Sequence, residues 1–238
     1  MSTYILVHGA YHGAWCYAKV APLLEAAGHT VVAVDLPGHG DNPVPRDQIT
    51  LAAYVEHVCR AIDDRAAPVI LVGHSLGGMT ISQVAEERSD KIKSLVFLTA
   101  MMPKDGESRA DVAARVDDNP AVMQARVPTG DGLASTVRDE MIKPLFYGDC
   151  SDDDIATAKA NLVPQASEII TAKVRLTDAN YGSVPRVFIE CLRDGAIPIE
   201  TQRQMVAAVP CGQVLTLDTS HSPFFSAPRD LADHLLSL

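Results

Sequence analysis

The sequence predicts an α/β fold, with a mostly parallel sheet of about six strands and helices on both faces. Short apolar runs rich in β-branched residues are typical of strands buried on both faces, and they alternate with stretches whose apolar residues recur at helical spacing. This alternation breaks over residues 103–181, which are rich in Asp and contain no convincing buried strand, and then resumes. We therefore expect a core of residues 1–102 and 182–238, with residues 103–181 inserted as a helical cap.

The elements before the insertion follow one another with short connections. Gly28 is expected to end the first helix, since glycine tolerates the left-handed conformation found there, and Thr50 is expected to cap the second. Apolar residues share one face of that second helix. In chain order we expect a strand over 4–7, a helix over 16–27, a strand over 30–35, a helix over 50–64, a strand over 68–72, a helix over 75–87 and a strand over 92–98.

The remaining elements complete the sheet. A Ser-x-x-Asp box predicts a helix over 151–162 within the cap. After the cap we expect a strand over 186–191, a helix over 198–209 that begins at a proline, a strand over 214–217 and a closing helix over 228–236. With right-handed crossovers the carboxyl ends of all strands meet at one edge of the sheet, where ligands bind in such folds.

The run Val-Gly-His-Ser-Leu-Gly-Gly, residues 72–78, fits the pattern Gly-x-Ser-x-Gly between an expected strand and an expected helix. Gly73 and Gly77 keep Cβ atoms away from the tight crossing of the two elements, which leaves the hydroxyl of Ser75 exposed. The helix is expected to begin at the serine, so that its dipole favours a negative charge there. A glycine-rich turn that merely contains a serine is the alternative interpretation.

A second strand-end loop, 9–15, contains several small residues and supports the interpretation of Ser75 as a nucleophile, because both lie at the same edge of the sheet. Small residues let a backbone approach a ligand closely. The N–H groups of Ala10 and Leu76 are the expected donors to an oxyanion.

A serine hydroxyl needs a base within hydrogen-bond reach, and that base needs a carboxylate to orient it. Of the eight histidines, only His221 follows a late strand, where the order serine, acid, histidine places the base; a surface histidine is the alternative. Asp194 follows the strand over 186–191 and is preferred as the acid to Asp218, which lies in the same loop as His221. The other histidines are His8, His12, His29, His39, His57, His74 and His234.

Composition narrows the possible partners. The formal net charge of -10 and the lack of a Lys/Arg cluster argue against nucleic acid and against an anionic membrane. Five cysteines without CxxC spacing predict neither a disulfide framework nor a zinc site, and no cofactor is expected. The first residues show no basic region followed by a long apolar segment, so a cytoplasmic location is expected.

The cap is expected to carry substrate specificity. Its apolar residues either line an acyl or alcohol pocket or form the interior of the cap. Exposed apolar cap surface would serve a homodimer or a substrate entrance equally well. The candidate lining residues are Met123, Leu145, Phe146 and Tyr147.

Four stretches carry a family resemblance: LVHGAYHGAW (6–15), LVGHSLGGM (71–79), YGSVPRVFI (181–189) and IPIETQRQM (197–205). They resemble the α/β-hydrolase branch that contains plant methylesterases and hydroxynitrile lyases, and bacterial carboxylesterases of the pyrethroid-hydrolase type look closer still. The resemblance implies that Ser75 is the nucleophile, Asp194 the acid and His221 the base, with an oxyanion hole formed by Ala10 and Leu76.

Two positions depart from the lyases of that branch. In the lyases a threonine follows the histidine of the first strand and a lysine follows the catalytic histidine, whereas this chain has Gly9 and Ser222. Because no cation is present there to stabilise departing cyanide, hydrolysis of a small-molecule ester is the expected reaction. Small to medium hydrophobic esters are expected, pyrethroid-like ones among them. A hydroxynitrile lyase, a carbon-carbon bond hydrolase and a non-catalytic receptor for a small ligand are the alternatives.

Overall fold

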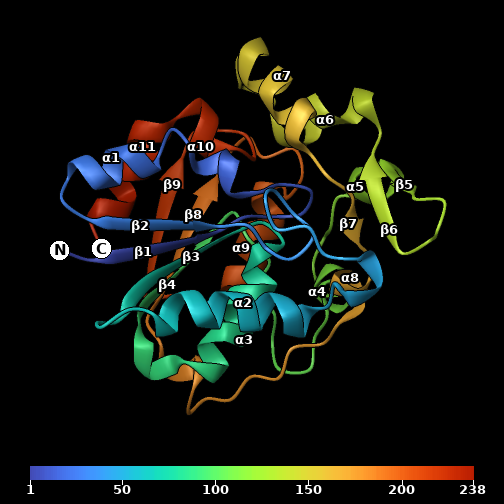
Figure 1. Ribbon diagram of the computed structural model, residues 1–238. Coiled ribbons are helices and arrows are strands. Elements are labelled where there is room, and N and C mark those ends of the chain that lie inside the picture. The colour runs from blue at the N-terminus through green and yellow to red at the C-terminus, as the bar shows by residue number, and fades with distance from the viewer.

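Six parallel strands form the central sheet, in the order β2-β1-β3-β4-β8-β9 (Figure 1). The computed structural model describes all residues, 1–238. The predicted fold class is confirmed, and the six strands expected from the sequence are those of the sheet. Their bounds are β1 (Thr3–Val7), β2 (Thr30–Val34), β3 (Val69–His74), β4 (Ile92–Leu98), β8 (Arg186–Cys191) and β9 (Gln213–Leu217).

Strand order reverses at β1, because the chain adds β2 on one side of it and β3 on the other. Connections leave such a point toward opposite faces of the sheet, which opens a crevice at the carboxyl ends of the two strands. The register pairs Val7 with Gly73, so the loop after β1 and the turn after β3 leave the sheet at the same level. At the other side, Cys191 pairs with Leu217, which brings the loops after β8 and β9 together in the same way.

Helices cover both faces of the sheet, as predicted. In Figure 1, α1 (Ala21–Ala26) and α11 (Pro228–Leu236) lie above the sheet, and α2 (Leu51–Asp63) and α3 (Gly77–Glu87) lie below it. Helix α9 (Ile199–Ala208) packs against β8. The predicted cap of α2 is present, since the Thr50 hydroxyl accepts a hydrogen bond from the Ala53 N–H at 3.1 Å. The predicted apolar face is buried through Leu51, Tyr54, Val58 and Ile62.

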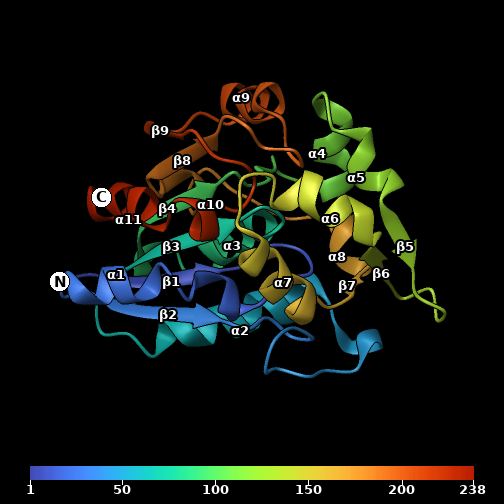
Figure 2. The same ribbon diagram turned by 90° about the horizontal axis from the view of Figure 1, so that it is seen from above.

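The segment between β4 and β8 lies beyond the carboxyl ends of the strands (Figure 2). Buried residues of this segment, such as Val112 and Ile169, belong to the same hydrophobic core as the strands. Its elements are α4 (Arg109–Arg115), α5 (Pro120–Gln124), β5 (Arg126–Pro128), β6 (Ala134–Val137), α6 (Asp139–Phe146), α7 (Asp152–Asn161), β7 (Gln165–Ala166) and α8 (Glu168–Thr171).

The expectation that this segment contains no buried strand was wrong. Strands β5, β6 and β7 form a small antiparallel sheet, and Ala134 and Ala166 within it are buried. Strands of two to four residues are too short to show the alternation by which a strand is read from sequence. The predicted helix over 151–162 is confirmed as α7, with the Ser151 hydroxyl accepting from the Asp154 N–H.

Two further expectations were wrong. The helix over 16–27 is divided into a 3-10 helix and α1, because Pro22 lacks the N–H that a helix interior requires and therefore sits in the first turn of α1. Helix α3 begins at Gly77 rather than at Ser75. An additional short helix, α10 (Pro223–Ser226), follows the loop after β9. Short 3-10 helices occur at Ala14–Tyr17, Arg46–Gln48, Ser89–Lys91 and Tyr181–Ser183.

No helix combines the length and the apolar composition needed to cross a bilayer.

Candidate active site

Ser75 lies at the sharp turn between β3 and α3 with a φ of 53°, in the left-handed region that residues other than glycine rarely adopt. Backbone hydrogen bonds hold it there: its N–H donates to Leu98, and its carbonyl accepts from Gly78 and Met101. Such strain persists only where the surroundings over-determine the backbone, and it is typical of functional sites. The side chain is half-buried and lines a pocket.

Glycines let the loop after β1 press against this turn. A Cβ atom on Gly77 would lie 2.7 Å from the carbonyl oxygen of His8. A Cβ atom on Gly9 would lie 2.8 Å from the Cβ of Ser75 and 2.9 Å from Nδ1 of His74. Distances under 3 Å are far below van der Waals contact, so both positions require glycine for the two loops to meet.

The structure brings His221 and Asp194 together. Nδ1 of His221 lies 2.6 Å from Oδ2 of Asp194, and both side chains are buried. His221 is the one histidine of the chain that contacts a carboxylate. Asp218 is turned away from it and pairs instead with the guanidinium of Arg193 at 2.8 Å. The proton on Nδ1 is therefore directed at Asp194, which leaves Nε2 of His221 free to act as a base.

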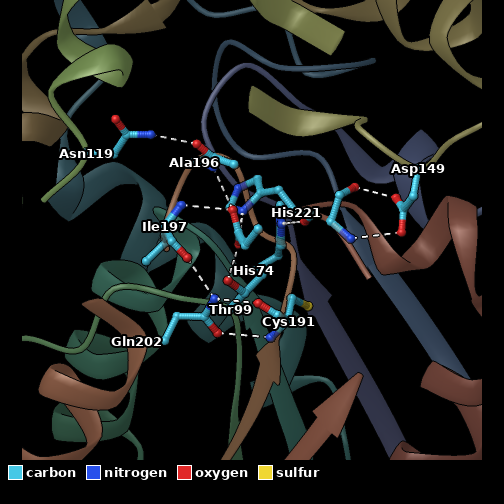
Figure 3. Close-up of polar contacts among 12 residues, drawn as sticks. His74, Thr99, Asn119, Asp149, Cys191, Ala196, Ile197, Gln202 and His221 are labelled. Atoms are coloured by element: carbon cyan, nitrogen blue, oxygen red, sulfur yellow. Dashed lines mark hydrogen bonds and ion pairs between the residues drawn. The ribbon is translucent and has the colours of Figure 1, made fainter. Parts of the chain in front are cut away.

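Hydrogen bonds to four groups satisfy the Asp194 carboxylate, and Figure 3 labels the residues that supply them, Thr99, Ala196, Ile197 and His221. Oδ1 accepts from the N–H groups of Ala196 and Ile197 at 2.7 and 2.8 Å, and Oδ2 accepts from the hydroxyl of Thr99 as well as from His221. A buried carboxylate is tolerated when its oxygens are paired in this way. Because Thr99 follows β4 directly, Asp194 is fixed from two strands of the sheet.

Two side chains hold the loop that carries His221. Nε2 of His74 donates to the carbonyl oxygen of His221 at 2.8 Å. From the segment between β4 and β8, the Asp149 carboxylate accepts from the N–H and the hydroxyl of Ser220 (Figure 3). Sequence reasoning missed Thr99, His74 and Asp149 as supports of the site. Only His74 was marked in the sequence, by its place next to Ser75.

Other histidines crowd the same region without acquiring charge. Burial lowers the pKa of His12 to about 3 and that of His39 to about 4, and it holds those of His8 and His74 well below the ordinary value. Nδ1 of His12 donates to the carbonyl oxygen of Ala10, so its Nε2 accepts from the hydroxyl of Tyr147. These neutral rings are structural groups of the core.

The pocket beside Ser75 is predominantly apolar, since ten of its 13 lining residues are hydrophobic. It encloses about 530 Å³ of empty space when its open mouth is included. Ala10 and Leu76 line it together with Ser75, and neither of their N–H groups donates a hydrogen bond within the protein. The segment between β4 and β8 contributes Met101, Arg109, Val122, Met123, Arg126, Phe146 and Ile170.

Of the four cap residues considered as lining, Met123 and Phe146 face the pocket. Leu145 and Tyr147 do not, because both pack into the core, where the Tyr147 hydroxyl contacts His12. The ring centroid of Phe146 also lies 5.7 Å from that of His221, so His221 packs beside a residue that lines the pocket.

The parallel sheet, the strained serine after β3 and the loops that converge on it define the architecture of the α/β hydrolases. The chain belongs to this family, since the model of the alpha/beta hydrolase family matches residues 4–234.

Methylesterase 1 of Arabidopsis thaliana is 36% identical to the chain, over 99% of this chain and 95% of that protein. Polyneuridine aldehyde esterase, a solved structure, is 31% identical with a TM-score of 0.90, covering 100% of this chain and 98% of its own. A pyrethroid hydrolase from Sphingobium faniae JZ-2 is 30% identical with a TM-score of 0.90, covering 99% and 96%. These similarities place the chain in the methylesterase-like branch of the family.

Proposed function

We propose that the chain hydrolyses carboxylic esters, with Ser75 as nucleophile, His221 as general base and Asp194 as its orienting acid. Esterase relatives that are 30–36% identical over nearly the whole chain identify it as a hydrolase of ester substrates. The observation that carries the assignment of roles is the Asp194–His221 contact of 2.6 Å, in loops at the same strand-end edge as a serine held at positive φ. Acyl transfer also requires Oγ of Ser75 within hydrogen-bond reach of Nε2 of His221, a contact that the proposal assigns to the substrate complex.

In the first half-reaction, Oγ of Ser75 attacks the ester carbonyl carbon while Nε2 of His221 takes the hydroxyl proton. The carbonyl oxygen becomes negative and accepts hydrogen bonds from the N–H groups of Ala10 and Leu76, each worth about 3 kcal/mol at the transition state. His221, protonated and paired with Asp194, then gives its proton to the leaving alcohol oxygen as the ester C–O bond breaks. An acyl-enzyme on Ser75 remains.

In the second half-reaction, His221 removes a proton from a water molecule, whose oxygen attacks the acyl carbon. The bond between that carbon and Oγ of Ser75 breaks, and His221 returns the proton to the serine. The carboxylic acid product and the starting enzyme result. No metal or organic cofactor takes part in these steps.

Residues 103–181 act in this proposal as a cap over the pocket. They contribute about half of its lining and one of the contacts that fix the His221 loop, through Asp149. The apolar walls favour hydrophobic acyl or alcohol groups over strongly hydrated ones. Small to medium hydrophobic esters, pyrethroid-like esters among them, are therefore the proposed substrates.

The same geometry argues against cyanohydrin cleavage. A threonine at position 9 would place its Cβ 2.8 Å from the Cβ of Ser75, so the hydroxyl found there in the lyases has no room. Ser222 follows His221 and is fully buried, and its hydroxyl carries no charge with which to stabilise cyanide.

Replacing Ser75 by Ala tests the proposal. We expect release of p-nitrophenol from p-nitrophenyl acetate to fall by at least about 1,000-fold, because loss of a serine nucleophile removes covalent catalysis. Ser237→Ala, which changes an exposed serine at the end of α11, is the matched control and is expected to retain full activity. Full activity of the Ser75→Ala protein would refute the proposal. Intact mass spectrometry of the enzyme quenched during turnover is expected to show one acyl group, absent in Ser75→Ala.

A further inference from the structure

Two arginines interrupt the apolar wall of the pocket, and only one of them is neutralised. Nη2 of Arg109 lies 3.0 Å from Oδ2 of Asp118, and both side chains are largely buried. Arg126, at the start of β5, forms no ion pair with any carboxylate of the chain, so the pocket carries one uncompensated positive charge. A guanidinium at an apolar pocket wall offers an anionic group of a bound ligand a charged partner.

Neutral contacts fix the position of the Arg126 guanidinium. Nε donates to the hydroxyl of Ser135 at 3.0 Å, across the β5–β6 hairpin, and Ser135 is buried. Nη1 lies 3.7 Å from Sδ of Met123, which itself lines the pocket. The head group is therefore held at the pocket wall instead of extending freely into solvent. Nη2 makes no hydrogen bond to the protein and remains available to a ligand.

We propose that Arg126 binds a carboxylate at the end of the substrate remote from the scissile ester. This inference rests on the proposed esterase function and narrows its substrates to half-esters of dicarboxylic acids with an apolar spacer. The planar guanidinium matches the two oxygens of a carboxylate, and charge-assisted hydrogen bonds of this kind are stronger than neutral ones. Apolar walls between Ser75 and Arg126 accommodate the methylene spacer.

Outside the pocket, the charge of the chain offers no attraction to an anionic ester. At a net charge of -10 the surface as a whole repels anions, and the Arg109–Asp118 pair adds no net charge to the pocket. Attraction of an anionic ester therefore depends on the one guanidinium of the pocket that has no carboxylate partner, because longer-range fields are screened within about 8 Å at physiological ionic strength.

Matched pairs of esters test the proposal. Monomethyl succinate, glutarate, adipate, pimelate and suberate are compared with the methyl esters of the monocarboxylic acids of equal chain length, and the ratio of kcat/KM within each pair is measured. We expect the wild-type ratio to peak at one spacer length. Arg126→Met, which keeps the apolar stem and removes the charge, is expected to lower the peak ratio at least about tenfold, mainly through KM.

Two further variants separate charge recognition from a structural role. Arg126→Lys keeps the charge without the planar fork and is expected to retain part of the preference. Arg138→Met removes an exposed arginine just after β6 that does not line the pocket, and is expected to leave the ratio unchanged. An unchanged ratio in Arg126→Met, or an equal fall in Arg138→Met, would overturn the inference.

A binding measurement separates this inference from the catalytic proposal. Calorimetry measures binding of the preferred half-ester to the Ser75→Ala protein and to the double variant Ser75→Ala/Arg126→Met. We expect the Kd of the double variant to be at least about tenfold higher. Equal affinity in the two proteins contradicts carboxylate recognition by Arg126. Hydrolysis that persists in Ser75→Ala contradicts the catalytic assignment of Ser75. The comparison of Kd values still decides whether Arg126 binds the carboxylate.

Discussion

His74 holds His221 in place. Nε2 of His74 donates to the carbonyl oxygen of His221 at 2.8 Å, and the centroids of the two rings lie 4.6 Å apart. The residue that precedes the proposed nucleophile thus fixes the backbone that carries the proposed base. Because burial holds the pKa of His74 well below its ordinary value, this ring acts as a neutral donor.

Substitution of His74 is expected to lower kcat by misplacing His221. His74→Phe keeps a ring but removes the donor, and we expect kcat to fall by about 10- to 100-fold with little change in KM, since small misplacements of catalytic groups have effects of this size. His74→Gln keeps a donor and is expected to recover most of the loss. Steady-state kinetics on p-nitrophenyl acetate measures both, and equal activity of the Phe and Gln proteins would count against a positioning role.

Thr99→Val tests the support that Thr99 gives to Asp194, the proposed acid. Valine is also β-branched, so the backbone strain at the φ of 36° observed for Thr99 is similar and the hydroxyl is the main group lost. Asp194 keeps three of its four hydrogen-bonding partners, and we expect kcat/KM to fall only several-fold. Asp194→Asn is expected to cost about 10,000-fold, because it favours the wrong tautomer of His221. A Thr99→Val loss as large as that of Asp194→Asn would contradict this ranking.

Gly9→Ala is expected to damage both activity and stability. The new methyl group would lie 2.8 Å from the Cβ of Ser75, and such overpacking costs about 1–3 kcal/mol. Gly130→Ala is the matched control, because a Cβ there meets no atom within 4 Å. Thermal unfolding and ester hydrolysis are measured for both. An unchanged Tm and kcat in Gly9→Ala would contradict this prediction, because the loop after β1 would then accommodate the methyl group at little cost.

Low pH is expected to destabilise the protein through its buried histidines. Their pKa values are lowered by burial, to about 3 for His12 and about 4 for His39, from an ordinary value of 6.5. Between about pH 4 and 6.5 the unfolded chain therefore binds more protons than the folded one, and the free energy of unfolding falls as the pH falls. Above pH 6.5 this contribution is constant.

Each such histidine contributes at most about 1.4 kcal/mol per pH unit within that window. Urea unfolding at pH 7, 6 and 5 measures the slope. His12→Gln retains a polar group opposite Tyr147. We expect it to reduce the slope of the unfolding free energy against pH by the amount that corresponds to close to one bound proton. The same slope in wild-type and His12→Gln proteins would mean that His12 does not titrate differently on unfolding.

Local patterns in the sequence were sufficient to predict the sheet and its helices. Continuous apolar runs mark β1, β3 and β4 because strands of a parallel sheet are buried on both faces. The Thr50 cap of α2 could be read in the same way, since it depends on residues within one turn. The position of Ser75 after β3 could be predicted from the glycines around it. The structure shows why they are needed, because a Cβ atom at these glycines would clash with neighbouring atoms.

The tertiary structure decided which residues meet. Thr99 reaches Asp194 across 95 residues of sequence, and His74 reaches the His221 loop across 147, and no periodicity within either segment encodes such a contact. The small sheet of β5, β6 and β7 escaped prediction for a related reason, because strands this short are stabilised by their partners and not by their own pattern. The sequence likewise could not show that Arg126 lines the pocket without an ion-pair partner, because this depends on where every carboxylate of the chain lies. Local patterns thus determined the elements and the candidate site residues, and packing between distant segments determined which residues support them.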